Sequence, residues 1–270
     1  MSQLTFSHKS QLSDMPKSEI PVDVLRDILD YVDKGDLPNI CRVNKICCYC
    51  SQDVLYRDIY VENRRISSVQ QILAQSSHLA RKVRSFDTLF DTDHLATALR
   101  NMTSLRKLRL PFRIYMDILD GCTFRLDSLG CYGVRNRNGS FQKFLSSQPS
   151  LEYVTFTMSF DPTLSLEATC LPNLTRIYAT FPWLPYLIPG RPVNEVITGQ
   201  CTENNHSTDL SFFALSTTPI RKLKIDYSYL YLTPGHLLAS FLPSLAHFTL
   251  TVFNCFSVFT DEGVCGLPLY

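Results

Sequence analysis

The 270-residue sequence has few glycines and almost no net charge. Its 10 glycines form no Gly-x-Ser-x-Gly, Gly-x-Gly-x-x-Gly or Gly-Lys-Ser/Thr motif, so the loops that enzymes use for nucleophiles, dinucleotides or phosphates are missing. The formal net charge of +1 gives no reason to expect nucleic acid or an anionic membrane as a partner. We therefore expect a chain that is not an enzyme, binds no cofactor, and has neither nucleic acid nor membrane among its partners.

Long apolar runs are also missing. No window approaches the roughly 18 apolar residues of a membrane span, and residues 1–18 are polar and serine-rich, without the apolar centre of a secretory signal. We expect residues 1–18 to form a flexible tail. Without a signal, the 10 cysteines are expected to be reduced thiols in a cytoplasmic and/or nuclear protein.

Four of those cysteines lie close together, at Cys41, Cys47, Cys48 and Cys50. Zinc sites of this kind usually pair two cysteines with a second pair downstream, and that second pair is missing. Cys47 and Cys50 are instead one helical turn apart, which suits an apolar helix face. We therefore expect no metal, and buried free thiols that pack as small apolar side chains.

What the sequence does contain begins with three short helices between residues 19 and 60. A stripe of apolar residues at helical spacing runs through the first of them and starts beside Pro21. Asp36 offers an N-cap carboxylate for the second, with Pro38 in its first turn, where a missing N–H costs nothing. Three small helices bury too little surface for a full core, so this unit is expected to complete its core against a partner or the following domain.

The order of these residues resembles the F-box. The family pattern is Ile/Leu-Pro, an acidic residue, paired apolar residues, Asp-Leu, Val-Ser/Asn-Lys and a closing Leu-Trp. Cys47 stands where Trp or Phe is usual, and Tyr56 replaces the closing Trp. An ordinary amphipathic helix pair would share the apolar spacing but not this ordered series. The matching segments are Ile20-Pro21, Asp23, Val24-Leu25, Ile28-Leu29, Asp36-Leu37, Val43-Asn44-Lys45 and Leu55-Tyr56.

The resemblance implies a substrate-recognition subunit of a Skp–cullin–F-box type ubiquitin ligase. Such a subunit binds a Skp-type adaptor, and through it a cullin, while its other domain holds a protein target that the sequence does not name. It acts by proximity, so no residue of this chain would make or break a bond. The alternative is a non-ligase interaction or scaffold protein whose F-box serves another complex. The residues that the resemblance places at the adaptor are Ile20, Pro21, Val24, Leu25, Ile28, Leu29, Leu37, Ile40, Val43 and Leu55.

After residue 80 the chain repeats a six-residue phrase with apolar residues at its first and fourth positions and an apolar or small residue at its sixth. The phrases start 19 to 27 residues apart, close to the period of leucine-rich repeats, in which each unit adds one strand and a returning helix or irregular arm. Apolar residues at helical spacing, and then polar or proline-bearing turns, precede several of the phrases. The phrases start at Val83, Leu105, Leu126, Leu151, Leu174, Val193, Ile220 and Leu245.

We therefore expect an α/β protein with an F-box at residues 19–60, a linker helix at 61–80 and an irregular leucine-rich-repeat solenoid with a curved parallel sheet at 81–270. The repeats resemble the degenerate ones of fungal F-box proteins. An unrelated α/β domain with alternating strands and helices is the competing interpretation. Only 20 residues follow the last phrase, without a polar capping repeat, as expected for a truncated gene product.

A proline-rich segment at residues 182–192 contains the single tryptophan, Trp183. We expect a rigid surface excursion within one repeat, in which Trp183 packs against its neighbours. Recognition of a partner by this loop is the less favoured alternative.

The third and fifth residues of each phrase face away from the core if the phrase is a strand. These positions hold basic and aromatic side chains in a chain that is near neutral. Exposed strand positions need polar residues in any case, which explains Lys and Arg better than Tyr. We expect a target-binding face there, suited to an acidic or phosphorylated segment. Its candidate residues are Lys107, Arg109, Tyr153, Arg176, Tyr178, Lys222 and Lys224.

Overall fold

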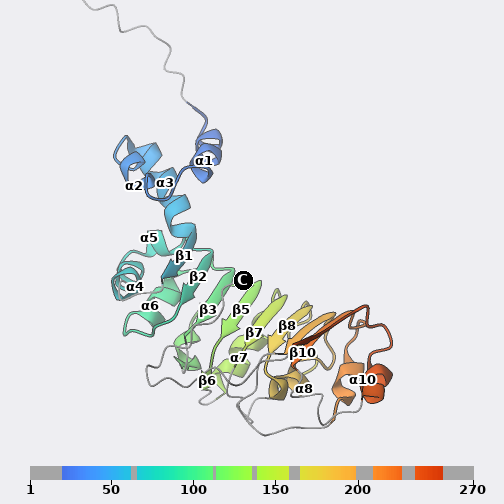
Figure 1. Ribbon diagram of the computed structural model, residues 1–270. Helices are drawn as coiled ribbons and strands as arrows, with labels where there is room; N and C mark the ends of the chain where they lie inside the picture. The colour runs from blue at the N-terminus through green and yellow to red at the C-terminus, as the bar shows by residue number, and fades with distance from the viewer. Residues whose placement is uncertain are drawn as a thin grey trace, which may run out of the picture. The chain divides into compact units, whose positions relative to one another are not determined.

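The chain divides into two units, Met1–Leu55 and Tyr56–Tyr270. Figure 1 shows short helices in the first unit and a sheet with flanking helices in the second. The boundary lies five residues before the one expected at residue 60. The structure is a computed structural model, and it describes residues 20–61, 66–111, 114–135, 139–157, 165–198, 209–226 and 235–251.

The first unit consists of the three helices that the sequence predicts. They are α1 (Val22–Asp30), α2 (Leu37–Ile40) and α3 (Lys45–Arg57), which runs two residues past the unit boundary. Pro38 lies in the first turn of α2, as expected. The expected side-chain cap at Asp36 is wrong, because its carboxylate makes no capping hydrogen bond.

An asparagine caps the longest of these helices. The Cys47 amide donates a hydrogen bond of 2.8 Å to Oδ1 of Asn44, the residue before α3. A side-chain acceptor at this position satisfies one of the amides that the first turn of a helix leaves unbonded. Asn44 therefore has a structural role that its place in the family pattern did not reveal.

The core of the first unit is small. Among its described residues, 20–55, four side chains are buried apolar groups: Leu29, Leu37, Cys50 and Val54. The half-buried side chains of Leu25, Val32, Ile40 and Leu55 pack around them. Of the clustered cysteines, Cys50 is buried as expected, whereas Cys41, Cys47 and Cys48 are only half-buried.

The second unit is built on nine parallel strands that lie in the sheet in the order in which they occur in the chain (Figure 1). The predicted α/β class and the parallel sheet are confirmed, and a second sheet of two parallel strands, β4 (Ile114–Tyr115) and β6 (Val134–Arg135), was not predicted. The strands are β1 (Asp58–Val61), β2 (Ser85–Thr88), β3 (Lys107–Leu110), β5 (Ser128–Cys131), β7 (Tyr153–Phe156), β8 (Arg176–Ala179), β9 (Glu195–Thr198), β10 (Lys222–Asp226) and β11 (His247–Thr251).

Eight of these strands begin two residues after a predicted phrase start, so the phrase locates the strand closely. The ninth, β1, was assigned to the helical unit, although Tyr56, Ile59 and Val61 occupy the first, fourth and sixth positions of the same phrase. Asp58 pairs with Ser85 in the register that the other phrases share. The resemblance of Leu55-Tyr56 to a closing Leu-Trp concealed this strand.

Helices and short arms return the chain between the strands, and their apolar residues share one core with the inner face of the sheet. The helix expected at residues 61–80 is represented by two helices, α4 and α5, separated by a single residue. The remaining elements are α4 (Ile66–Gln75), α5 (Ser77–Ala80), α6 (Leu95–Asn101), β4 (Ile114–Tyr115), η1 (Met116–Leu119), β6 (Val134–Arg135), α7 (Ser140–Ser146), η2 (Phe181–Trp183), α8 (Leu184–Leu187), η3 (Ser211–Leu215) and α10 (Gly235–Phe241).

The fourth phrase residue is buried in the strands that have neighbours on both sides. Leu108, Leu129, Val154, Ile177 and Leu223 are buried, as predicted. The same prediction for Phe248 is wrong, because this side chain on β11 is 47% exposed. β11 is the last strand of the described sheet, so no further described strand and arm cover its inner residues.

Trp183 packs inside the second unit, as expected. It is 1% exposed, and its ring centroid lies 4.8 Å from that of Phe156 and 6.4 Å from that of Phe141. Edge and tilted contacts of this kind stabilise aromatic clusters beyond the area that they bury. The proline-rich segment is therefore part of the core packing.

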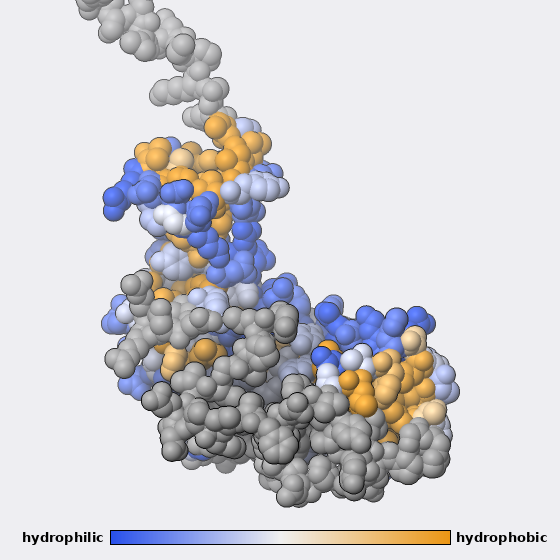
Figure 2. All heavy atoms as spheres, viewed as in Figure 1, coloured by the Kyte–Doolittle hydropathy of each residue, from blue (hydrophilic) through white to orange (hydrophobic). Residues whose placement is uncertain are grey.

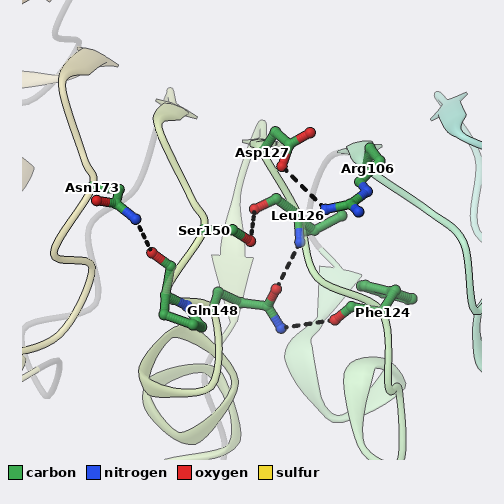
Figure 3. A network of polar contacts seen from close by, with 8 residues as sticks. Arg106, Phe124, Leu126, Asp127, Gln148, Ser150 and Asn173 are labelled. Atoms are coloured by element: carbon green, nitrogen blue, oxygen red, sulfur yellow. Dashed lines mark hydrogen bonds and ion pairs between the residues drawn. The ribbon is translucent and has the colours of Figure 1, made fainter.

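Polar side chains connect consecutive arms of the second unit, as Figure 3 shows. Buried Gln148 accepts a hydrogen bond of 2.9 Å from the Leu126 amide and donates one of 3.3 Å to the Phe124 carbonyl. Asn173 donates one of 2.9 Å to the carbonyl of Pro149. These bonds satisfy main-chain groups that irregular arms would otherwise bury unpaired.

A buried arginine holds together one connecting segment of the second unit through main-chain hydrogen bonds. Arg191 is 1% exposed, and its guanidinium donates hydrogen bonds of 2.9 Å to four main-chain carbonyls, those of Glu167, Cys170, Tyr186 and Pro189. Burial lowers the pKa of Arg191, since the charged form loses its hydration. The four acceptors hold the charge in place and join residues 165–170 to α8 and the segment that follows it.

Candidate functional site

The first unit carries apolar side chains that its small core does not use. Val24 and Ile28, one turn apart on α1, are 47% and 48% exposed, and Val43 is 69% exposed. Ile20, before the helix, is also exposed. Figure 2 shows hydrophobic residues gathered over this unit. Exposed apolar residues that cluster in this way mark interaction sites more often than isolated ones do.

The structure divides the ten predicted adaptor-contacting residues into three groups. Five are exposed, three are half-buried against the unit's own core, and two belong to that core. The buried pair has little surface to offer a partner, and its position indicates that it holds the three helices together. The groups are Ile20, Pro21, Val24, Ile28 and Val43; then Leu25, Ile40 and Leu55; and finally Leu29 and Leu37.

Further exposed side chains on α3 were missed by sequence reasoning. Ile46 and Tyr49, one turn apart on α3, are exposed, and exposed Val43 lies two residues before the helix begins. The guanidinium carbon of Arg26, on α1, lies 5.8 Å from the Tyr49 ring centroid, and its Nη2 lies 3.4 Å from Asp53 Oδ2. The three-residue spacing of Ile46 and Tyr49 is typical of one helix face and could have predicted this exposed pair, but neither residue belongs to the family pattern.

The second candidate surface is the face of the sheet that carries the third and fifth phrase residues. Strand register places these residues in two parallel rows across the nine strands. All seven predicted target-binding residues lie in these rows. The first row is Asp58, Ser85, Lys107, Ser128, Tyr153, Arg176, Glu195, Lys222 and His247; the second is Tyr60, Asp87, Arg109, Gly130, Thr155, Tyr178, Ile197, Lys224 and Thr249.

Acidic residues in the same rows neutralise part of the predicted basic character. Arg109 Nη1 lies 3.0 Å from Asp87 Oδ2 on the neighbouring strand, and Lys222 Nζ lies 3.8 Å from Glu195 Oε2. Lys107 and Lys224 are exposed and have no carboxylate within salt-bridge distance in the part of the chain that the structure describes. Their strands are five steps apart, so about 24 Å separates the two lysines.

Tyrosines gather at the middle of this face. The guanidinium carbon of Arg176 lies 5.3 Å from the ring centroid of Tyr153, a cation–π geometry. Burial raises the pKa of Tyr178, and the nearby Tyr153 and Tyr132 add to that rise. Tyr132 was missed by sequence reasoning, because it follows the six-residue phrase by one position and continues the same alternation.

A shallow hollow lies beside these tyrosines, over β5. Its volume is ≈150 Å³, and its floor is formed by Ser128 and Gly130. A Cβ atom on Gly130 would lie 3.1 Å from Cγ of Arg109, closer than almost all real contacts. The remaining lining residues are Ser85, Phe86, Asp87, Lys107, Leu108, Arg109, Tyr153 and Thr155.

Other kinds of site find little support within the described ranges. No group of three or more His, Cys, Asp or Glu side chains there is placed to hold a metal ion. Among the helices of the described residues, none has the length and apolar character needed to cross a membrane. Comparison with known proteins gives no match, either to a family model or to a curated sequence.

Proposed function

We propose that this protein is a substrate-recognition subunit of a Skp–cullin–F-box type ubiquitin ligase. The observation that carries the proposal is the set of exposed apolar residues on a three-helix unit whose described part buries four apolar side chains in its own core. Exposing such a surface to water is unfavourable by about 25 cal/mol per Å² of apolar area, so a partner that covers it gains that free energy. The order of residues that resembles the F-box selects a Skp-type adaptor as the partner that covers it.

In this proposal the residues of the helical unit have two roles. The exposed Val24, Ile28 and Val43 contact the adaptor, while Leu29 and Leu37 keep the helices in position. Charged residues are depleted at the centre of protein interfaces, which agrees with an apolar contact surface here.

The second unit holds the target. Its parallel strands follow one another at the period of leucine-rich repeats, and the exposed rows of the sheet supply polar, basic and aromatic side chains for contact. The chain contributes proximity between the target and the ubiquitin-charged enzyme, and no catalytic group. This agrees with a sequence that lacks the loop motifs of common enzyme classes.

The test is co-purification with the adaptor and the cullin. Val24→Asp combined with Ile28→Asp places two charges in an apolar interface, at a cost of several kcal/mol, and should reduce recovery of the adaptor by more than about 100-fold. Leu25 is unsuitable for this purpose, since it packs against the unit's core. The matched control is Ile72→Asp, an exposed apolar residue on α4 of the second unit, which should leave recovery unchanged.

Three outcomes separate the possibilities. Adaptor and cullin recovered together with the wild-type chain support the ligase subunit. Adaptor recovered without cullin supports the alternative of a non-ligase scaffold. No adaptor with the wild-type chain, or undiminished adaptor with the double variant at an unchanged circular dichroism spectrum, removes the proposal.

A further inference from the structure

The hollow over β5 has the size of a single side chain. Its volume of ≈150 Å³ is well below the range of about 300–1,000 Å³ that encloses drug-sized ligands. It lies on the exposed face of a sheet, between β3 and β7. A metabolite would remain mostly in water there, whereas one side chain of an extended peptide would fit.

The small residues of β5 create this hollow. Gly130 and Ser128 lie between the longer Lys107 and Arg109 on one side and Tyr153 on the other. The stem of Arg109 lies so close to Gly130 that a Cβ atom would push it aside by a few tenths of an ångström. A larger side chain at this position would also occupy the hollow itself.

The charges around the hollow match one negative charge. Among its lining residues, Lys107 and Arg109 contribute two positive charges and Asp87 one negative charge, a balance of +1. A carboxylate would bring this balance to zero and would accept hydrogen bonds from both cations. A phosphate group carries about −1.5 to −2 at pH 7, so it would exceed the available positive charge and be repelled more strongly than a carboxylate by Asp87, which lies 3.0 Å from the same arginine.

We infer that the hollow binds an Asp or Glu side chain of an extended, unphosphorylated target segment, and that Gly130 determines this specificity. The inference rests on the proposed function only in calling the bound segment a target. In an extended segment, every second side chain faces the same way, so one residue can enter the hollow while its neighbours point elsewhere. Tyr153, which lines the hollow, supplies apolar area beside it.

The experiment is a selection of unmodified random 12-residue peptides, displayed on phage, against the full chain. Asp or Glu is expected at one constant position of the selected peptides. A synthetic selected peptide should bind at least about tenfold more weakly when that residue is changed to Gln or to phosphoserine, since a hydrogen bond to a charged group is worth one order of magnitude or more in affinity.

Two variants of the chain test the location. Lys107→Gln should weaken peptide binding about tenfold, whereas Lys224→Gln, an exposed lysine in the same sheet face about 24 Å away, should have no effect. Gly130→Val fills the hollow with a residue suited to strands and should abolish binding. Lys107→Gln keeps the test valid if Gly130→Val does not fold.

Several results would overturn the inference. They are the selection of no binding peptide, a consensus without a constant acidic residue, tighter binding of the phosphoserine peptide, or equal effects of the two lysine variants. These readouts do not involve the adaptor. Peptide binding without adaptor binding would reject the ligase subunit and keep this site. Adaptor binding without peptide binding would keep the ligase subunit and reject this site.

Discussion

Replacing Arg191 by methionine should strongly destabilise the second unit. The side chain is 1% exposed and donates to four main-chain carbonyls. Methionine has a similar reach but no donor, so all four acceptors would lose their partner. At about 1.5–3 kcal/mol for each hydrogen bond to a charged group, the gross loss is about 6–12 kcal/mol.

Part of this loss is offset, because the variant no longer buries a guanidinium without its hydration shell. The desolvation of a buried ion costs several kcal/mol, and the variant is spared that cost. Subtracting it from the gross loss leaves an expected fall of about 3–5 kcal/mol in the free energy of unfolding. Such a value lies in the upper tail of single substitutions.

The single tryptophan provides the assay. Trp183 is buried in the same unit, eight residues before Arg191, so its fluorescence in a urea titration reports unfolding of this part of the chain. Arg221→Met is the matched control, since Arg221 is exposed, and its effect should stay within about 0.5 kcal/mol. A loss below about 1 kcal/mol for Arg191→Met, or equal losses for the two variants, would show that the buried guanidinium does not hold this arm together.

Two further predictions concern the second unit. Gly190→Ala should lower the free energy of unfolding by more than about 2 kcal/mol, because φ is +75° and the new Cβ would lie 2.6 Å from Cβ of Ala168. The control Gly139→Ala, with φ of +69° and open space, should lower it by only about 1 kcal/mol. Equal losses of the two variants in thermal unfolding would contradict this. Burial raises the pKa of the Cys131 thiol, so above about pH 8.5 the unfolded chain releases a proton that the folded chain keeps, and stability should fall by up to about 1.4 kcal/mol per pH unit from this thiol. In urea titrations from pH 8 to 10, the free energy of unfolding should fall less steeply with pH for Cys131→Ala than for the wild type. An equal slope for the two proteins would show that the Cys131 thiol does not cause the fall.

The six-residue phrase alone locates eight of the nine described strands of the large sheet. Each phrase has its apolar residues at positions that a strand places on one face, and this alternation is a local property of the chain. Parallel pairing in chain order then follows, because each unit can bury its inner face only against the next one. The exception, Phe248, lies on the last described strand, where the same local pattern has no following described unit to cover it.

Which residues are available for contact depends on packing between distant parts of the chain. Val24 and Leu29 belong to the same apolar stripe of α1, yet one is 47% exposed and the other is buried, because α2 and α3 cover only one side of that stripe. Arg109 has no acidic neighbour within its own phrase, yet strand register places Asp87, 22 residues earlier in the chain, opposite it, with Oδ2 3.0 Å from Arg109 Nη1. Burial and charge pairing depend on neighbours from distant parts of the chain, and no local pattern contains that information.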